Sequence, residues 1–104
     1  MNTSANKHDA LEELIYTEGI RIQAIHAYPE LDTLLVLLNT GAILQETLSQ
    51  YERLKNASSE ALNHYELIGK GTGAHWPELD EDLSLKSFLK DSIRNQVLRN
   101  ARVA

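Results

Sequence analysis

The chain has 104 residues, of which 42% are hydrophobic and 24% are charged, and its formal net charge is −5. These values are typical of one globular domain and exclude a disordered chain. The absence of cysteine excludes disulfides, thiol nucleophiles and thiolate metal sites. No apolar run approaches the ~20 residues of a membrane-spanning helix. Because residues 1–9 are polar and cysteine is absent, we expect a cytoplasmic protein that makes no membrane contact.

The first half of the chain changes from helical to strand periodicity. Residues 1–7 are interpreted as a disordered leader, and apolar side chains at helical spacing predict a short helix over residues 8–16. Three strands are expected next, at residues 20–24, 33–38 and 42–48, as an antiparallel meander. Since every residue of the middle strand from position 34 onward is apolar, we expect that strand to be covered on both faces.

The second half of the chain predicts shorter elements. Ser58 is a good N-cap for a helix over residues 59–64. Short strands are expected at residues 65–68 and 74–76, on either side of a glycine-rich turn. An acidic loop follows, and apolar periodicity predicts a last helix over about residues 85–100.

These elements predict an α+β fold with a small antiparallel sheet, made of a three-strand meander plus one or two short strands, together with short helices and a C-terminal helix. We divide the chain into an N-terminal extension with a short helix (residues 1–18), an α+β domain (residues 19–91) and a C-terminal helical basic tail (residues 92–104). The tail carries three arginines and no acid, a net +3, whereas residues 78–91 carry five acids and two lysines, a net −3. We recognise no internal repeat.

The stretch at residues 73–84 reads GAHWPELDEDLS. It resembles the closing signature of a small bacterial family of unknown function, G-x-x-W-P-x-L-D-x-D-[LI]-S. Residues 34–41 and the helix after Ser58 resemble the first hairpin and the short helix of that family, so the resemblance covers about residues 20–89. It implies a small α+β domain whose gene often lies beside that of another small family, as in toxin–antitoxin pairs. It implies no activity and no catalytic residue.

The signature residues are interpreted as a structural loop, in which Trp76 and Leu79 anchor the chain in the core. Asp80 and Asp82 precede the last helix and suit its positive N-terminal end. In the alternative interpretation, Asp80 and Asp82 hold a hard cation or form an acid–base pair. Their spacing is not that of an EF-hand loop. The loop comprises Trp76, Pro77, Leu79, Asp80, Asp82 and Ser84.

Two other patterns were weighed as sites. The four histidines form no H-x-x-x-H pair, and a metal site would require His64 or His75 to meet the acidic loop. The glycines at positions 69, 71 and 73 lack the G-x-x-x-x-G-K-[ST] spacing of a phosphate-binding loop, so a turn is favoured. We expect no metal and no cofactor.

The basic tail supplies the candidate partner-binding residues. Three cations beside an apolar side chain on one helix are suited to an acidic protein surface or to phosphates. We expect a non-catalytic protein-interaction or regulatory module, antitoxin-like, whose partner is another small protein encoded by an adjacent gene or a second copy of the chain. A nucleic-acid-binding accessory protein is the alternative, and a metal-dependent hydrolase centred on the acidic loop is less favoured. The candidate residues are Arg94, Val97, Arg99 and Arg102.

Overall fold

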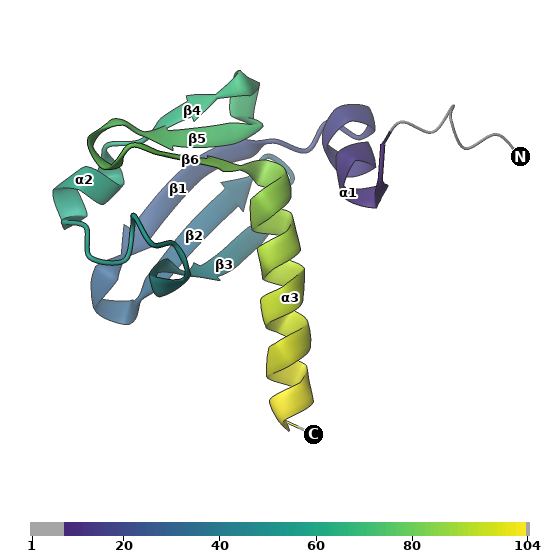
Figure 1. Cartoon of the computed structure of the whole chain (residues 1–104). Coiled ribbons are helices and arrows are strands. Elements are labelled where there is room, and N and C mark those ends of the chain that lie inside the picture. Colours follow the sequence, from purple (N-terminus) through teal and green to yellow (C-terminus); the bar gives the residue numbers. More distant parts are fainter. Residues whose placement is uncertain (1–7, 104) are drawn as a thin grey trace, which may run out of the picture.

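The computed structural model describes the backbone of residues 8–103 and the side chains of residues 8–98 (Figure 1). The leader at residues 1–7 lies outside the described residues. The chain begins with α1 (Ala10–Glu12), which continues as the π-helical turn η2 (Glu13–Thr17). Asp9 caps α1 by accepting the Glu12 N–H at 2.8 Å, and Glu12 accepts the Asp9 N–H in return. This reciprocal capping box stabilises a helical segment that is very short.

The first three strands form sheet A. They are β1 (Ile22–Tyr28), β2 (Thr33–Leu38) and β3 (Ile43–Thr47), all antiparallel and in the order β1-β2-β3. The short 3₁₀ helix η3 (Pro29–Leu31) connects β1 to β2. The predicted three-strand meander is therefore confirmed.

The later strands form a second sheet, sheet B. It consists of β4 (Glu66–Ile68), β5 (Gly73–Trp76) and β6 (Glu81–Ser84), again antiparallel and in chain order. Before it lies α2 (Ser59–Asn63), whose N-cap Ser58 accepts the Ala61 N–H at 3.1 Å. The prediction that residues 81–84 form a loop is wrong. In the register with β5, Leu83 lies opposite Ala74 and packs against the core, and this alternation favours a strand despite the two acids, Glu81 and Asp82.

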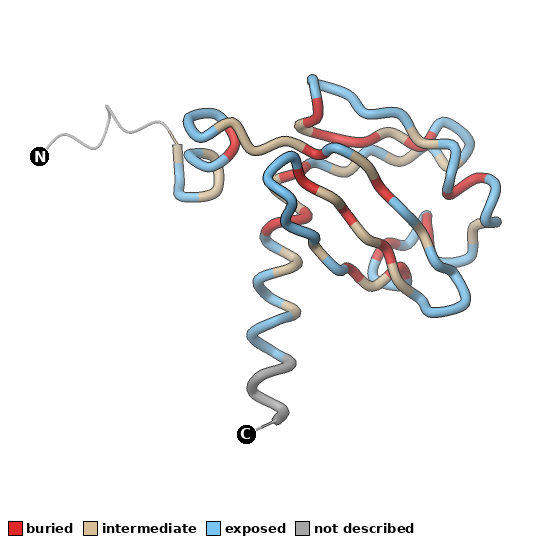
Figure 2. Tube along the Cα trace, turned by 180° about the vertical axis from the view of Figure 1, so that it is seen from behind, coloured by how far each residue is buried: buried red, intermediate tan, exposed pale blue. Residues whose placement is uncertain are grey.

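The two sheets lie one over the other and share one core, which α3 (Leu85–Val103) closes at one side (Figure 1). The predicted α+β class is confirmed. Residues buried in this core alternate along β2 and β5, as the two-residue period of a strand requires (Figure 2). The fully buried side chains that meet there include Leu34 and Val36 of sheet A, Ala74 and Trp76 of sheet B, and Leu85 and Phe88 of α3.

The expectation that β2 is covered on both faces is wrong for the residues that the structure describes. Leu34, Val36 and Leu38 point into the core. Leu35 and Leu37 point to the opposite face, are only half-buried and do not pack against the core. The strand is apolar on both faces, yet within one copy of the chain only one face is covered.

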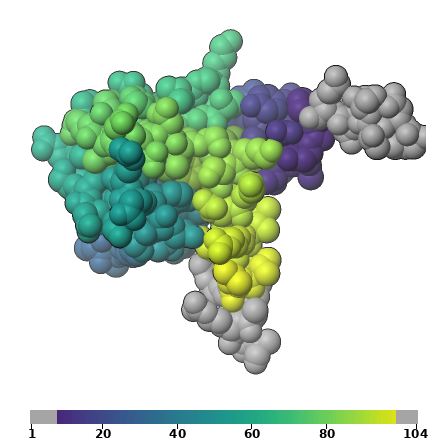
Figure 3. All heavy atoms as spheres, in the orientation of Figure 1, coloured from purple at the N-terminus to yellow at the C-terminus, as the bar shows by residue number. Residues whose placement is uncertain are grey.

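Helix α3 is continuous, as the sequence predicted for residues 85–100. Its first half packs against the core, and its second half extends away from the rest of the molecule (Figure 3). Within residues 8–103, no helix combines the length and the apolar character needed to span a membrane.

Candidate functional site

Trp76 anchors the signature segment in the core. Its side chain is fully buried, and its Nε1–H donates to the carbonyl of Leu62 at 3.0 Å. The hydrogen bond satisfies the only polar atom of a large apolar ring. The expectation that Trp76 is a core residue is confirmed, and the bond fixes α2 against β5.

The turn after Trp76 is the 3₁₀ helix η6 (Pro77–Leu79), which ends at Asp80 in the left-handed conformation, with φ of +51°. Asp is among the few non-glycine residues that adopt this conformation readily. Leu79 packs against the core, whereas the Asp80 carboxylate is exposed and lies 3.8 Å from the Arg53 guanidinium. The backbone geometry gives Asp80 a role in the turn itself.

The sequence Pro-Glu-Leu-Asp occurs twice, at residues 29–32 and 77–80. Both copies join consecutive antiparallel strands, and in both the aspartate has φ of +51°. This short internal repeat was not predicted from the sequence, although its four residues are identical in the two copies. The two aspartates make different contacts. Asp32 accepts hydrogen bonds from the Ser49 backbone N–H and hydroxyl, at 2.9 Å and 2.6 Å, whereas Asp80 faces Arg53.

Ser84, and not the acidic residues, caps α3. Its hydroxyl oxygen accepts the Ser87 N–H at 3.0 Å. Because β6 separates Asp80 from α3, and Asp82 bonds across the sheet, the expected contact of these carboxylates with the helix N-terminus is wrong. Asp82 lies opposite His75 in the register of sheet B, and its Oδ1 contacts the His75 Nδ1.

The histidines of the second half form pairs and not a cluster. The His64 Nδ1 contacts the Glu78 carboxylate, and this hydrogen bond raises the pKa of His64. His75 stands between Glu66 of β4 and Asp82 of β6 in one cross-strand row. Among residues 8–98, no three His, Asp or Glu side chains converge as a metal site would require. The acidic loop, His64 and His75 are thus not brought together in one site.

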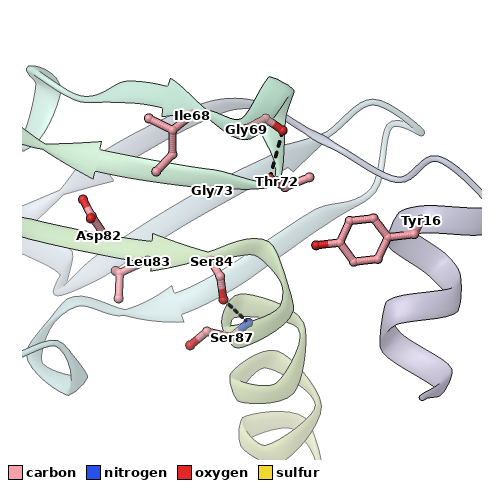
Figure 4. A pocket seen from close by; sticks show the side chains of 9 residues that line it. All are labelled: Tyr16, Ile68, Gly69, Thr72, Gly73, Asp82, Leu83, Ser84 and Ser87. Atoms are coloured by element: carbon pink, nitrogen blue, oxygen red, sulfur yellow. Dashed lines mark hydrogen bonds between the residues drawn. The ribbon is translucent and has the colours of Figure 1, made fainter. Parts of the chain in front are cut away.

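A groove of about 530 Å³ lies on the outer face of sheet B, between β4, β6 and η2 (Figure 4). Gly73 forms part of its floor, since a Cβ there would lie 3.3 Å from the Ile68 side chain. The adjacent turn η5 (Gly69–Gly71) passes close to β1, and a Cβ at Gly71 would lie 2.9 Å from the carbonyl oxygen of Ile22. Close backbone approach accounts for this glycine. The groove is lined by Tyr16, Ile68, Gly69, Thr72, Gly73, Asp82, Leu83, Ser84 and Ser87.

A buried carboxyl group, which the sequence did not reveal, lies between β3 and α3. Glu46 is 1% exposed, and burial raises its pKa to about 8. The Tyr51 hydroxyl lies 3.4 Å from the Glu46 Oε1 and donates to the Asp91 carboxylate at 2.9 Å. The Glu46 Oε2 has no hydrogen-bond partner among the described residues. The alternation of Leu44 and Glu46 along β3 was the available signal, but a charged residue at an inward position is ordinarily read as exposed.

The second half of α3 leaves apolar side chains in solvent. Gln50 and Asn95 exchange two side-chain hydrogen bonds, at 3.2 Å and 3.0 Å, which attach this part of α3 to the segment after β3. Beyond them Val97 is 59% exposed and Leu98 is 51% exposed. Arg94 is exposed as well. The side chains of Arg99 and Arg102 lie outside the described residues.

Two solved structures resemble this fold. A crystal structure of a protein of unknown function from Rhodospirillum rubrum ATCC 11170 is 28% identical in sequence and superposes with a TM-score of 0.60, covering 68% of this chain and 86% of that chain. A solution NMR structure of an uncharacterised protein from Chromobacterium violaceum is 24% identical, with a TM-score of 0.64 over 88% of this chain and 87% of that chain. The second likeness concerns the fold alone. No curated protein matches the chain.

The sequence of residues 22–94 matches the family DUF2442, described as a protein of unknown function. This span contains both sheets, the signature segment and the packed half of α3. The chain therefore belongs to the DUF2442 family.

Proposed function

We propose that the chain is a non-catalytic protein-interaction module that regulates another small protein, in an antitoxin-like role. The signature at residues 73–84 resembles a family whose genes often lie beside those of a second small family, and this arrangement suggests the partner. The chain would act in the cytoplasm, where both gene products meet.

The observation that carries the proposal is the exposed half of α3. Residues 85–103 carry five basic side chains and one acid, a net +4, whereas the rest of the chain carries a net −9. On the same segment Val97 and Leu98 are more than half exposed. An amphipathic helix that presents apolar and basic groups away from its own domain is suited to an acidic groove on a partner protein.

Binding to the neighbouring gene product tests this function. We expect a stable complex on co-expression, and we expect Arg94→Glu with Leu98→Glu to weaken it at least about tenfold, the effect of losing one interface anchor. Ile68→Glu is the matched control, because Ile68 is exposed but lies on sheet B. If the wild-type proteins form no complex, or if the control weakens binding equally, this function is wrong.

The basic charge of α3 also favours a second function, an accessory role in nucleic-acid binding. Binding to duplex DNA would fall steeply as salt rises, because each phosphate contact releases counterions. The net −9 of the remaining chain opposes it. Tight, salt-sensitive binding to DNA, lost in Arg94→Glu, would place this function first.

A further inference from the structure

The outer face of sheet A carries no Asp, Glu, Lys or Arg side chain. In the register of the sheet, three rows of side chains point away from the core. None of the nine positions is Asp, Glu, Lys or Arg, although 24% of the chain is charged. The rows are Ala24, Leu37 and Ile43; His26, Leu35 and Gln45; and Tyr28, Thr33 and Thr47.

This face is apolar at its centre. Leu35 and Leu37 lie side by side on β2 and are half-buried, although neither packs against the core. Ile43, opposite Leu37, is 58% exposed. An antiparallel sheet that faces water on one side ordinarily alternates apolar and polar residues, and β2 does not.

Helix α3 borders this face. Ile43 and Gln45 of β3 line a small pocket together with Ser92 and Gln96 of α3. Ile93 follows Ser92 on α3 and points about 100° away from it around the helix axis. Ile93 is 51% exposed. In the view from behind, sheet A lies toward the viewer with α3 at its side (Figure 2). The flat face and the helix that borders it form one surface.

We propose that this surface binds a second copy of the chain, with the outer faces of the two sheets A packed against each other. Charge supports this occupant. Two copies that each carry −5 repel one another, and contact is least opposed where neither brings a charge. In such a pair the basic α3 of each copy also lies beside the other copy, whose remaining residues are acidic.

The area of the surface limits the affinity of the dimer. Three strands spaced about 4.8 Å apart and about 20 Å long present a flat face of roughly 300 Å². A standard stable interface buries about 800 Å² per partner, so the sheet alone is too small and the flank of α3 must contribute. We expect a reversible dimer that dissociates in the micromolar range.

Sedimentation velocity of the full chain over a concentration series tests the proposal. The wild type is expected to form dimers, and Ile43→Glu is expected to be monomeric, because it brings two buried like charges together. Ile68→Glu, which places the same charge on the outer face of sheet B, should leave the dimer intact. Both isoleucines are exposed, so the melting temperatures of the two variants should match that of the wild type when all are monomeric.

The dependence of dimerisation on salt concentration distinguishes a contact through the uncharged face from a contact made by the α3 charges alone. Raising the salt concentration screens both the repulsion between the two acidic copies and the attraction of each α3 to the other copy, so dimerisation through the uncharged face should persist, whereas a contact made by the α3 charges alone should be lost. A wild-type monomer at all concentrations overturns the proposal, as does a dimer that Ile43→Glu leaves unchanged. If the chain stays monomeric, and if Ile43→Glu abolishes its binding to the neighbouring gene product, the uncharged face binds that partner and not a second copy. The proposed function is tested independently, since Arg94→Glu with Leu98→Glu leaves the sheet face unaltered.

Discussion

The two sheets have the same topology, but their outer faces differ in charge. Each is a three-stranded antiparallel meander with a Pro-Glu-Leu-Asp turn between two of its strands, and each contributes its inner face to one core. The outer face of sheet B carries the row Glu66, His75 and Asp82. The outer face of sheet A carries Leu35, Leu37 and Ile43 instead. The charged row suits the outer face of sheet B to solvent, whereas we propose that the uncharged face of sheet A is covered by a second copy of the chain.

The comparison also distinguishes the residues that stabilise the fold from the residues that contribute little to its stability. The inner positions of β2 and the inner residues Ala74 and Trp76 of β5 are buried, so they should dominate stability. Outer positions should affect stability little, and those of sheet A should affect association. The changes below are ordered from the largest expected effect to the smallest.

Trp76→Ala should cost about 3–5 kcal/mol of the free energy of unfolding, as expected for a large buried aromatic, because it also removes the bond to Leu62. Leu37→Ala, on the outer face of sheet A, should cost below about 1 kcal/mol in dilute solution, where the chain is monomeric. Urea unfolding followed by circular dichroism measures both. Equal costs would show that the outer face of sheet A is part of the core of one copy.

Glu46 should make stability depend on pH. Its pKa is raised from 4.5 to about 8 in the folded state, so the folded chain binds this proton more tightly than the unfolded chain does. The stabilisation is full below about pH 4.5 and is lost as the pH rises through about 8, a change of a few kcal/mol.

Glu46→Gln keeps the shape of the side chain and removes the titration. We expect the variant to be more stable than the wild type at pH 8, with a flatter pH dependence between pH 5 and 8. Thermal unfolding at several pH values measures this. Parallel curves for the two proteins would mean that Glu46 ionises normally.

Ser84 lies on the outer face of sheet B, and Ser84→Ala removes the hydroxyl that caps α3. The expected loss is about 1 kcal/mol, the usual value for an N-cap hydroxyl. Gln45→Ala, at an exposed position on the outer face of sheet A, is the control and should change the unfolding free energy by less than about 0.5 kcal/mol. If the serine variant unfolds at the same urea concentration as the wild type, the hydrogen bond to Ser87 contributes nothing.

Asp80→Asn with Asp82→Asn should have the smallest effect, because asparagine also adopts the left-handed conformation of Asp80 and only the charges are lost. Loss of helix capping would predict about 1–2 kcal/mol, but neither carboxylate caps α3, and exposed ion pairs such as Asp80 with Arg53 contribute less than about 1 kcal/mol. Differential scanning calorimetry of the double variant checks this. A cation that raises the melting temperature of the wild type, and not of the variant, would instead establish a metal site.

Much of the fold could be predicted because local chemistry decides it. Strand periodicity predicted sheet A, and Ser58 predicted the start of α2. Strand β6 was missed because its acids suggest a loop, and only its pairing with β5 shows that Leu83 alternates inward. The burial of Glu46 was missed for the same kind of reason. It depends on α3, which begins at Leu85, 39 residues after Glu46, and no local pattern indicates such a contact.

The apolar run at Leu34–Leu38 is hydrophobic on both faces of β2, although one copy of the chain covers only one of these faces. The sequence indicated a strand covered on both faces, whereas the described residues cover one. If a second copy supplies the missing cover, the sequence pattern is correct for the dimer.

Methyl NMR spectra recorded over a range of protein concentrations test the difference between the two outer faces most directly. We expect the methyl resonances of Leu35, Leu37 and Ile43 to shift progressively as the concentration rises, while those of Ile68 on sheet B stay fixed. Fixed resonances on sheet A, or shifts confined to Ile68, would contradict the assignment of the uncharged face as the contact between copies.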